Sequence, residues 1–255
     1  MKRFILFFGI GFWLILATPA CKPTVDHKDP QYLIDQLIKA HGSKVFDQSI
    51  IEFRMGNRFY KSTRNRGQFF YERFWDSLGV TIHDALSNSG FARQVGQGEI
   101  ILDTKKIDDY SSSLRSIMYL FALPFGFNEP AAVKTYLGEV ILMEQPYHKI
   151  KITFMLNPLD RTIHDNVYVA WIHKTRFTMD YLGYLLNEPA EKGTRFLQAT
   201  NPRKLEKLLV QDYMVFSPAQ DNVPVQPEDL DQAWAANQLI ALPSILVTQL
   251  KIRHK

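Results

Sequence analysis

Apolar and polar residues alternate with a period of two along most of this chain. The alternation comes in short runs that turns separate, first in residues 49–102 and again in residues 135–252. A period of two is typical of β-strands, and many short strands joined by tight turns indicate an antiparallel sandwich or barrel. We expect strands at 49–55, 58–63, 68–75, 79–86, 91–95 and 99–102, and then at 135–143, 147–156, 167–173, 176–185, 194–198, 207–216 and 239–252. The last run is an edge strand or a pair of strands, and the run before it is a strand or a helix that becomes one.

Three segments have helical periodicity instead. Residues 31–41 place their apolar side chains on one side, and Gly42 follows as a suitable C-terminal cap. Residues 111–127 are the most apolar run after the N-terminus. We expect the three serines at its start to cap the first turn, and Pro124 and Gly126 to end the helix. A short third helix is expected at 228–236, after a proline-rich loop.

The N-terminus has the pattern of an export signal. A basic start is followed by an apolar run over 4–16 and by small residues up to Ala20. The apolar run is shorter than the roughly 20 residues of a membrane span. We therefore predict a signal peptide at 1–20, with a transmembrane anchor as the alternative.

Cys21 is the only cysteine, so the chain forms no internal disulfide. Its position directly after the signal resembles a bacterial lipoprotein signal, in which this thiol is lipidated. The resemblance is partial, because Thr18 stands where such signals have leucine. Cleavage nearby by ordinary signal peptidase, or an uncleaved anchor, are the alternatives. A polar tether at 21–30 and a single domain at 31–255 complete the predicted organisation.

Charge argues against nucleic acid as a partner. The chain has 30 basic and 26 acidic residues and a formal charge of +4, and two of the basic residues belong to the leader. The remaining charges are well mixed along the chain, whereas nucleic-acid binding needs a clustered basic surface.

The sequence contains no catalytic motif. In His83-Asp84 and His164-Asp165 the two side chains point to opposite faces of a strand, which does not suit a metal site. Gly96-Gln97-Gly98 lacks the further glycine and lysine of a phosphate loop. We therefore expect no enzyme, no metal site and no cofactor.

The element order, together with Cys21, the tether and a helix that ends in His41-Gly42, resembles the uncharacterised bacterial envelope lipoproteins of the LolA/LolB-like lipoprotein-carrier superfamily. The resemblance implies an α+β, β-rich fold, in which a strongly curved antiparallel sheet forms a half-barrel. The mid-chain apolar helix covers its concave face. It also implies an acyl chain as ligand, no catalytic residues, and a place in the bacterial cell envelope, as an outer-membrane lipoprotein that faces the periplasm or the cell surface.

An apolar helix over a curved sheet leaves either a filled core or a pocket for an apolar ligand. If a pocket exists, the large apolar side chains around the helix are its predicted contacts: Trp75, Met118, Phe121, Phe125, Phe154 and Trp171. The first hairpin is rich in basic residues. Arg54, Arg58 and Arg64 are the candidates for contact with anionic headgroups, or otherwise form a solvated edge.

Three hypotheses of function follow. The preferred one is a non-enzymatic, lipid-anchored envelope protein that binds a lipid or another hydrophobic ligand in the half-barrel. The alternative is a structural or interaction module of the envelope with a packed core and a protein partner. The third, an envelope hydrolase with a hidden site, has no residue pattern in its favour.

Overall fold

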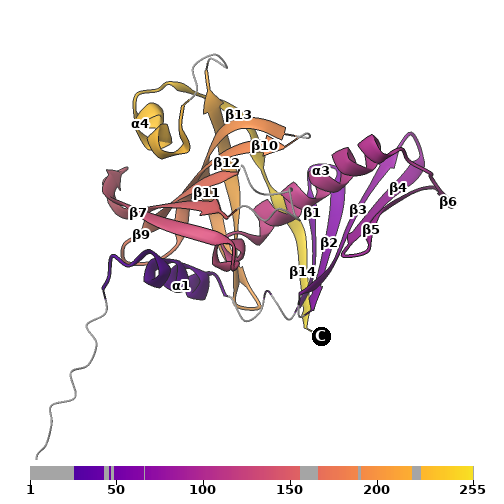
Figure 1. Cartoon of the computed structure of the whole chain (residues 1–255), viewed down its shortest axis with the longest axis horizontal. Coiled ribbons are helices and arrows are strands. Elements are labelled where there is room, and N and C mark those ends of the chain that lie inside the picture. The colour runs from indigo at the N-terminus through magenta and orange to yellow at the C-terminus, as the bar shows by residue number, and fades with distance from the viewer. Residues whose placement is uncertain are drawn as a thin grey trace, which may run out of the picture.

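The computed structural model of the chain describes residues 26–42, 46, 49–65, 67–155, 166–188, 191–219 and 225–254. Two curved antiparallel sheets of seven strands each surround one helix, α3 (Thr104–Ala122) (Figure 1). The spatial order in sheet A is β14 (Val247–His254), β1 (Ser49–Met55), β2 (Arg58–Asn65), β3 (Gln68–Ser77), β4 (Val80–Ser87), β5 (Gly90–Val95) and β6 (Gly98–Glu99). The order in sheet B is β13 (Leu239–Ile245), β12 (Leu208–Pro218), β11 (Glu191–Leu205), β10 (Met179–Glu188), β9 (Val167–His173), β8 (Gln145–Phe154) and β7 (Ala132–Leu142).

The C-terminal strands join the two sheets. β13 and β14 follow each other with only Leu246 between them, and β13 pairs with β12 while β14 pairs with β1. The Asp212 carboxylate accepts a hydrogen bond from the Val247 N–H at 2.9 Å and fixes the crossing point. The segment 239–252, expected as an edge strand or a pair of strands, is therefore a pair, with β13 in sheet B and β14 in sheet A. The two joined sheets form an open half-barrel.

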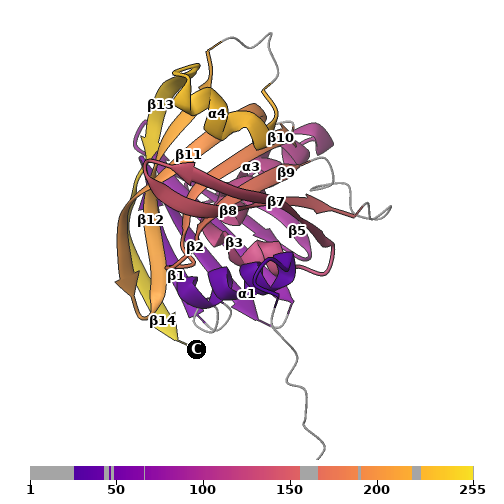
Figure 2. The same cartoon turned by 90° about the vertical axis from the view of Figure 1, so that its left-hand side faces the viewer.

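Helix α3 lies inside this half-barrel, and we call the face of each sheet that contacts α3 its inner face (Figures 1 and 2). Leu114, Met118 and Ala122 pack into the apolar core of sheet A. Tyr119 and Leu120 project to the other side, into the core of sheet B. Because both sides of its second half are apolar, this part of the helix packs between the two sheets, and this confirms the expected half-barrel with a covered concave face.

The start of α3 was predicted wrongly. The helix begins at Thr104 and not at residue 111, and the Asp103 carboxylate caps it by accepting from the Lys106 N–H at 2.9 Å. Ile107 is the only aliphatic residue in the first turns, which are mostly exposed, so the apolar pattern did not extend there. The serines that we expected as caps lie in mid-helix, where Ser111 donates to the carbonyl of Ile107. After α3 a short helical turn, η1 (Phe125–Asn128), closes the segment.

Helix α1 (Pro30–His41) has the predicted position and cap. Leu33, Ile34 and Leu37 are fully buried against the inner face of sheet B. Gly42 ends the helix with φ of +96°. A Cβ atom there would lie 2.3 Å from the carbonyl oxygen of Lys207. The turn between β11 and β12 can therefore come this close only because residue 42 is a glycine.

The other face of sheet B, which we call its outer face, has its own small core. Helix α4 (Leu230–Ala235) and the turn η2 (Pro227–Asp229) cover it, as expected for residues 228–236. Gly183 permits this close approach, because a Cβ atom would lie 2.9 Å from Leu230.

Several strand limits differ from the predicted ones. The strands expected at 176–185 and 194–198 extend further, because Leu186 pairs with Gly193 and β11 continues to Leu205. At the other end of the chain, β6 is limited to Gly98–Glu99. Backbone pairing sets these limits, and the side-chain pattern does not record it.

The predicted signal peptide at 1–20, Cys21 and most of the tether lie outside the described residues, as does His164-Asp165. Within the described ranges, no helix is both long enough and apolar enough to cross a bilayer.

Candidate functional site

An apolar pocket lies where the two sheets meet, below the end of α3. Its lining comes from the ends of α1 and α3, the start of η1, the strands β1, β12, β13 and β14, and Phe46. The free volume is about 30 Å³, which is room for about one water molecule. We call it the seam pocket, and its lining residues are His41, Phe46, Met55, Leu120, Phe121, Leu123, Phe125, Leu208, Leu209, Val210, Gln211, Tyr213, Ile245 and Val247.

Aromatic stacking holds the helix end in the seam pocket. Phe121 stacks on Phe53 of β1 with ring centroids 3.9 Å apart, and Phe125 stacks on Phe46 at 4.4 Å. Both pairs are nearly parallel, with interplanar angles of 11° and 19°. Aromatic pairs of this kind contribute about 0.5–1.5 kcal/mol each beyond the area that they bury, so the two stacks help to fix the end of the helix.

His41 and Gln211 bring polar groups to this apolar lining. His41 Nε2 accepts a hydrogen bond from the Met179 N–H at 3.2 Å. Burial lowers the pKa of His41 from 6.5 to about 4, against the opposing effect of Asp180, so its ring is neutral at pH 7. Gln211 Oε1 is buried and has no hydrogen-bond partner in the described part of the chain.

Of the six predicted ligand contacts, three surround the end of α3. Phe121 and Phe125 line the seam pocket, and Met118 is buried beside them in the core of sheet A. Phe154 lies on the inner face of sheet B, where its ring meets the edge of Tyr119.

Trp171 lies elsewhere. It projects from the outer face of sheet B into the core below α4, and its indole N–H donates to Asp231 at 3.2 Å. Its neighbours Ala170 and Ile172 belong to the inner face, because successive residues of a strand alternate. The sequence could not show this, since both faces of β9 are apolar.

Trp75 lies on the inner face of sheet A among charged groups, not in an apolar pocket. The guanidinium carbons of Arg58, Arg73 and Arg93 lie 4.9, 5.4 and 5.4 Å from its ring centroid. No local sequence pattern predicted this cluster. A signal was available, because Arg73 pairs across the strands with Asp84, and Asp84 pairs with Arg93.

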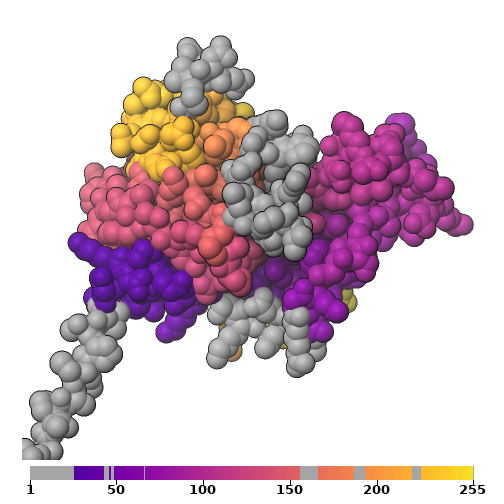
Figure 3. Space-filling model, viewed as in Figure 1, coloured from indigo at the N-terminus to yellow at the C-terminus, as the bar shows by residue number. Residues whose placement is uncertain are grey.

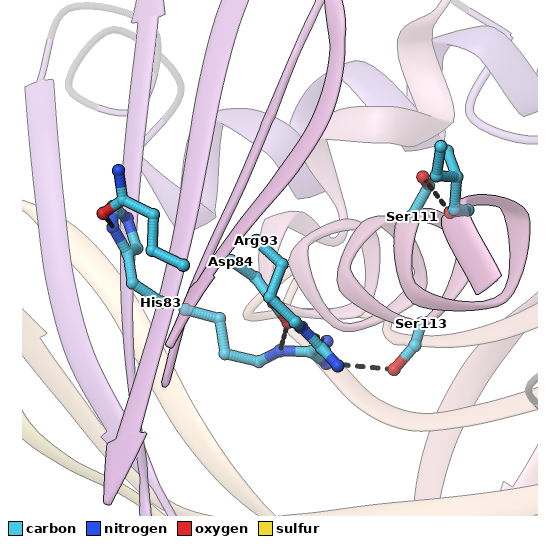
Figure 4. A network of polar contacts seen from close by, with 8 residues as sticks. His83, Asp84, Arg93, Ser111 and Ser113 are labelled. Carbon is cyan, nitrogen blue, oxygen red and sulfur yellow. Dashed lines mark hydrogen bonds and ion pairs between the residues drawn. The ribbon is translucent and has the colours of Figure 1, made fainter. Parts of the chain in front are cut away.

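These side chains form a buried ionic network below α3 (Figure 4). The Asp84 carboxylate, which is fully buried, accepts from Arg73 Nη2 at 2.6 Å and from Arg93 Nε at 2.6 Å. Arg73 Nη1 donates to the hydroxyl of Ser113 at 3.0 Å and so links the sheet to α3. Burial lowers the pKa of Arg93, but its hydrogen bonds with Asp84 and the charge of Asp84 outweigh burial and raise it.

His83 points away from this network, as the strand period predicted (Figure 4). It stacks on Phe74 with ring centroids 4.2 Å apart and lies 3.3 Å from Glu72. No group of three or more His, Cys, Asp or Glu side chains in the described ranges could hold a metal ion.

The three predicted headgroup arginines do not form one patch. Arg54 lies over Phe59 on the outer face of sheet A, whereas Arg58 lies over Trp75 on the inner face. Arg64 lies over Phe46, about 20 Å along β2 from Arg58 at the usual rise of a strand. Proximity in sequence suggested a cluster, but the alternation of faces separates Arg54 from Arg58, and distance along β2 separates Arg64 from Arg58.

Two solved structures similar to this one have low sequence identity to it. A DUF1329 family protein from Desulfovibrio piger is 11% identical, with a TM-score of 0.46, and the match covers 87% of this chain and 92% of that one. A LolA superfamily protein from Nitrosomonas europaea is 8% identical, with a TM-score of 0.41, and the match covers 89% of this chain and 94% of that one.

No curated protein matches the sequence. The model of a protein family described as a family of unknown function, DUF6503, matches residues 45–237. This match spans more than half of the chain, from the residues before β1 to the end of α4. The chain therefore belongs to the DUF6503 family.

Proposed function

We propose that this protein is a non-enzymatic, lipid-anchored protein of the bacterial envelope that binds an acyl chain between α3 and the inner faces of the two sheets. One observation carries the proposal. The end of α3 closes an apolar pocket at the junction of the sheets through stacked aromatic rings, and packing of ring on ring can open without breaking a hydrogen bond.

Ligand entry requires this end of α3 to move. The seam pocket has a free volume of about 30 Å³, whereas pockets for small ligands have volumes of about 300–1,000 Å³. If Phe121 and Phe125 separate from Phe53 and Phe46, an acyl chain can replace the rings against the same apolar lining. In the described structure the end of α3 is closed on the sheets.

A fluorescent fatty acid tests the proposal. The protein should bind it with an increase in probe emission, and Phe121→Asp should weaken binding by about tenfold or more, because a carboxylate in an apolar pocket is costly. Leu78→Asp is the matched control, since Leu78 lies fully exposed in the turn between β3 and β4. Absence of binding to any acyl probe would remove the proposal.

The small free volume favours a second candidate, the interaction module with a packed core. It predicts no acyl binding and requires an envelope protein partner. Capture of a partner from envelope extracts would support it if charge reversal of Arg54, Arg58 and Arg64 abolished the capture.

Anchoring through Cys21, and with it a position in the outer membrane, is part of the proposal. Mass spectrometry of the mature N-terminus should find a lipidated Cys21. An unmodified N-terminus at another residue would contradict this part while leaving acyl binding open.

A further inference from the structure

Cross-strand pairing arranges the inner face of sheet A in rows. One row runs across five strands and lies partly below α3: Phe53, Tyr60, Arg73, Asp84 and Arg93. The neighbouring row lies nearer to the hairpin turns, and it consists of the pair Met55 and Arg58 and the connected residues Trp75, Ile82 and Val95. Helix α3 and the last strands of sheet A project together from the rest of the molecule (Figure 3).

Positive charge is in excess here. Three guanidinium groups surround the ring of Trp75, and two of them, those of Arg73 and Arg93, share the Asp84 carboxylate. Asp84 is saturated, because Oδ1 accepts from Arg93 and Oδ2 accepts from both Arg73 and Arg93. Arg58 has no carboxylate within ion-pair distance in the described part of the chain. The cluster therefore has a net charge of +2.

An oxyanion would match this arrangement. Guanidinium groups bind carboxylates and phosphates through paired N–H donors, and a site that is partly shielded from water strengthens these bonds. Arg58, Trp75 and Arg93 are half-buried, in contrast to the fully exposed side chains of the turns beside them. We call these three residues the arginine strip.

The arginine strip is continuous with the seam pocket. Met55 lines the pocket and pairs directly with Arg58 across the first hairpin. Phe53, on which Phe121 stacks, is two residues before Met55 on the same face. A chain that replaced Phe121 in the pocket would therefore end beside the guanidinium group of Arg58.

We infer that the arginine strip binds the phosphate or carboxylate headgroup of an amphiphile whose chain occupies the seam pocket. The inference rests on the proposed function and makes it more specific, because it selects anionic amphiphiles over neutral ones. It also replaces the predicted patch of Arg54, Arg58 and Arg64 with a site in which Arg58 acts together with Arg93.

The test compares ligands that differ in one part only. The protein is purified with its native N-terminus and kept in solution by an uncharged amphipathic polymer. Dodecyl phosphate and dodecanoate share their chain with neutral dodecanol, while inorganic phosphate has the charge without the chain. We expect the two anionic amphiphiles to bind at least about tenfold more tightly than dodecanol, as a charge-assisted hydrogen bond in a shielded site should give.

Variants assign the preference to the strip. Arg58→Gln should remove most of the preference without weakening dodecanol binding. Arg54→Gln, on the outer face of the same hairpin, should change neither the preference for anionic amphiphiles nor the binding of dodecanol. Dodecyl phosphate should also change the tryptophan fluorescence, and Trp75→Phe should abolish that change. Circular dichroism and Tm show that each variant is folded.

The outcomes are distinct. If dodecanol and dodecyl phosphate bind equally, the inference is wrong and the proposed function stands. If inorganic phosphate binds as tightly as dodecyl phosphate, the site takes free phosphate and the headgroup assignment is wrong. If no amphiphile binds, the proposed function itself fails.

Discussion

At the scale of single residues, the His41-Gly42 pair joins three parts of the molecule. His41 accepts a hydrogen bond from the backbone of β10, and Gly42 lies directly against the turn between β11 and β12. The two residues end α1. The sequence predicted the helix end from Gly42. It could not predict why the histidine is there, because its partner, the Met179 N–H, is distant in sequence and is a backbone group.

Gly42→Ala should destabilise the protein. The left-handed conformation alone costs an alanine about 1 kcal/mol, and the clash with the Lys207 carbonyl adds to this cost. Gly67→Ala is the matched control, because Gly67 also has a positive φ, of +84°, but has open space around its Cβ position. Urea unfolding should show a larger loss for Gly42→Ala, and equal losses would contradict the close approach.

His41 should make stability dependent on pH. Its pKa is 6.5 when exposed and about 4 when folded, so at pH between these values the unfolded chain binds a proton that the folded protein does not. The stability from neutral His41 is therefore complete above pH 6.5 and is lost as the pH falls to about 4, by roughly 3 kcal/mol in total.

Unfolding curves measured across this range should have a flatter pH dependence in His41→Gln, which keeps an acceptor but does not titrate. His254→Gln, at an exposed histidine, should retain the wild-type slope. A wild-type slope in His41→Gln would show that other groups cause the effect.

At the scale of elements, the strands were predictable and the start of the mid-chain helix was not. A period of two located almost every strand, since most strands turn one face toward the apolar core. The first turns of α3 are exposed and polar, so only the cap at Asp103 marks them. The positions of the candidate sites could not be predicted in this way, because they depend on which face of the sheet each side chain takes and on which strands pair. Arg54 and Arg58 are close in sequence but lie on opposite faces, whereas Arg73 and Arg93 are distant in sequence and share Asp84.

The ionic network should be essential for the packing of α3 on sheet A. Asp84→Asn removes the one buried charge that balances two arginines, and we expect it to lower the free energy of unfolding by about 3 kcal/mol or more. Asp109→Asn, in an exposed ion pair with Lys105 on α3, should have little effect. Equal stability of the two variants in urea would contradict the role given to the network.

At the scale of the whole molecule, the joined sheets provide one continuous inner surface with two kinds of chemistry. The seam pocket is apolar, and the arginine strip beside it is cationic. The opposite side of sheet B is closed by α4, and Trp171 is buried there. Which apolar residues share a surface depends on how β13 and β14 join the sheets, and no local sequence pattern contains that information.

A fatty acid with a photoreactive diazirine in its chain tests the location of the ligand most directly. After irradiation of the complex, peptide mass spectrometry identifies the labelled residues. The account predicts labels on Met55, Phe121 and Phe125 around the seam pocket and none on Trp171 or Trp234. Labels confined to the outer face below α4, or none above the background without light, would contradict it.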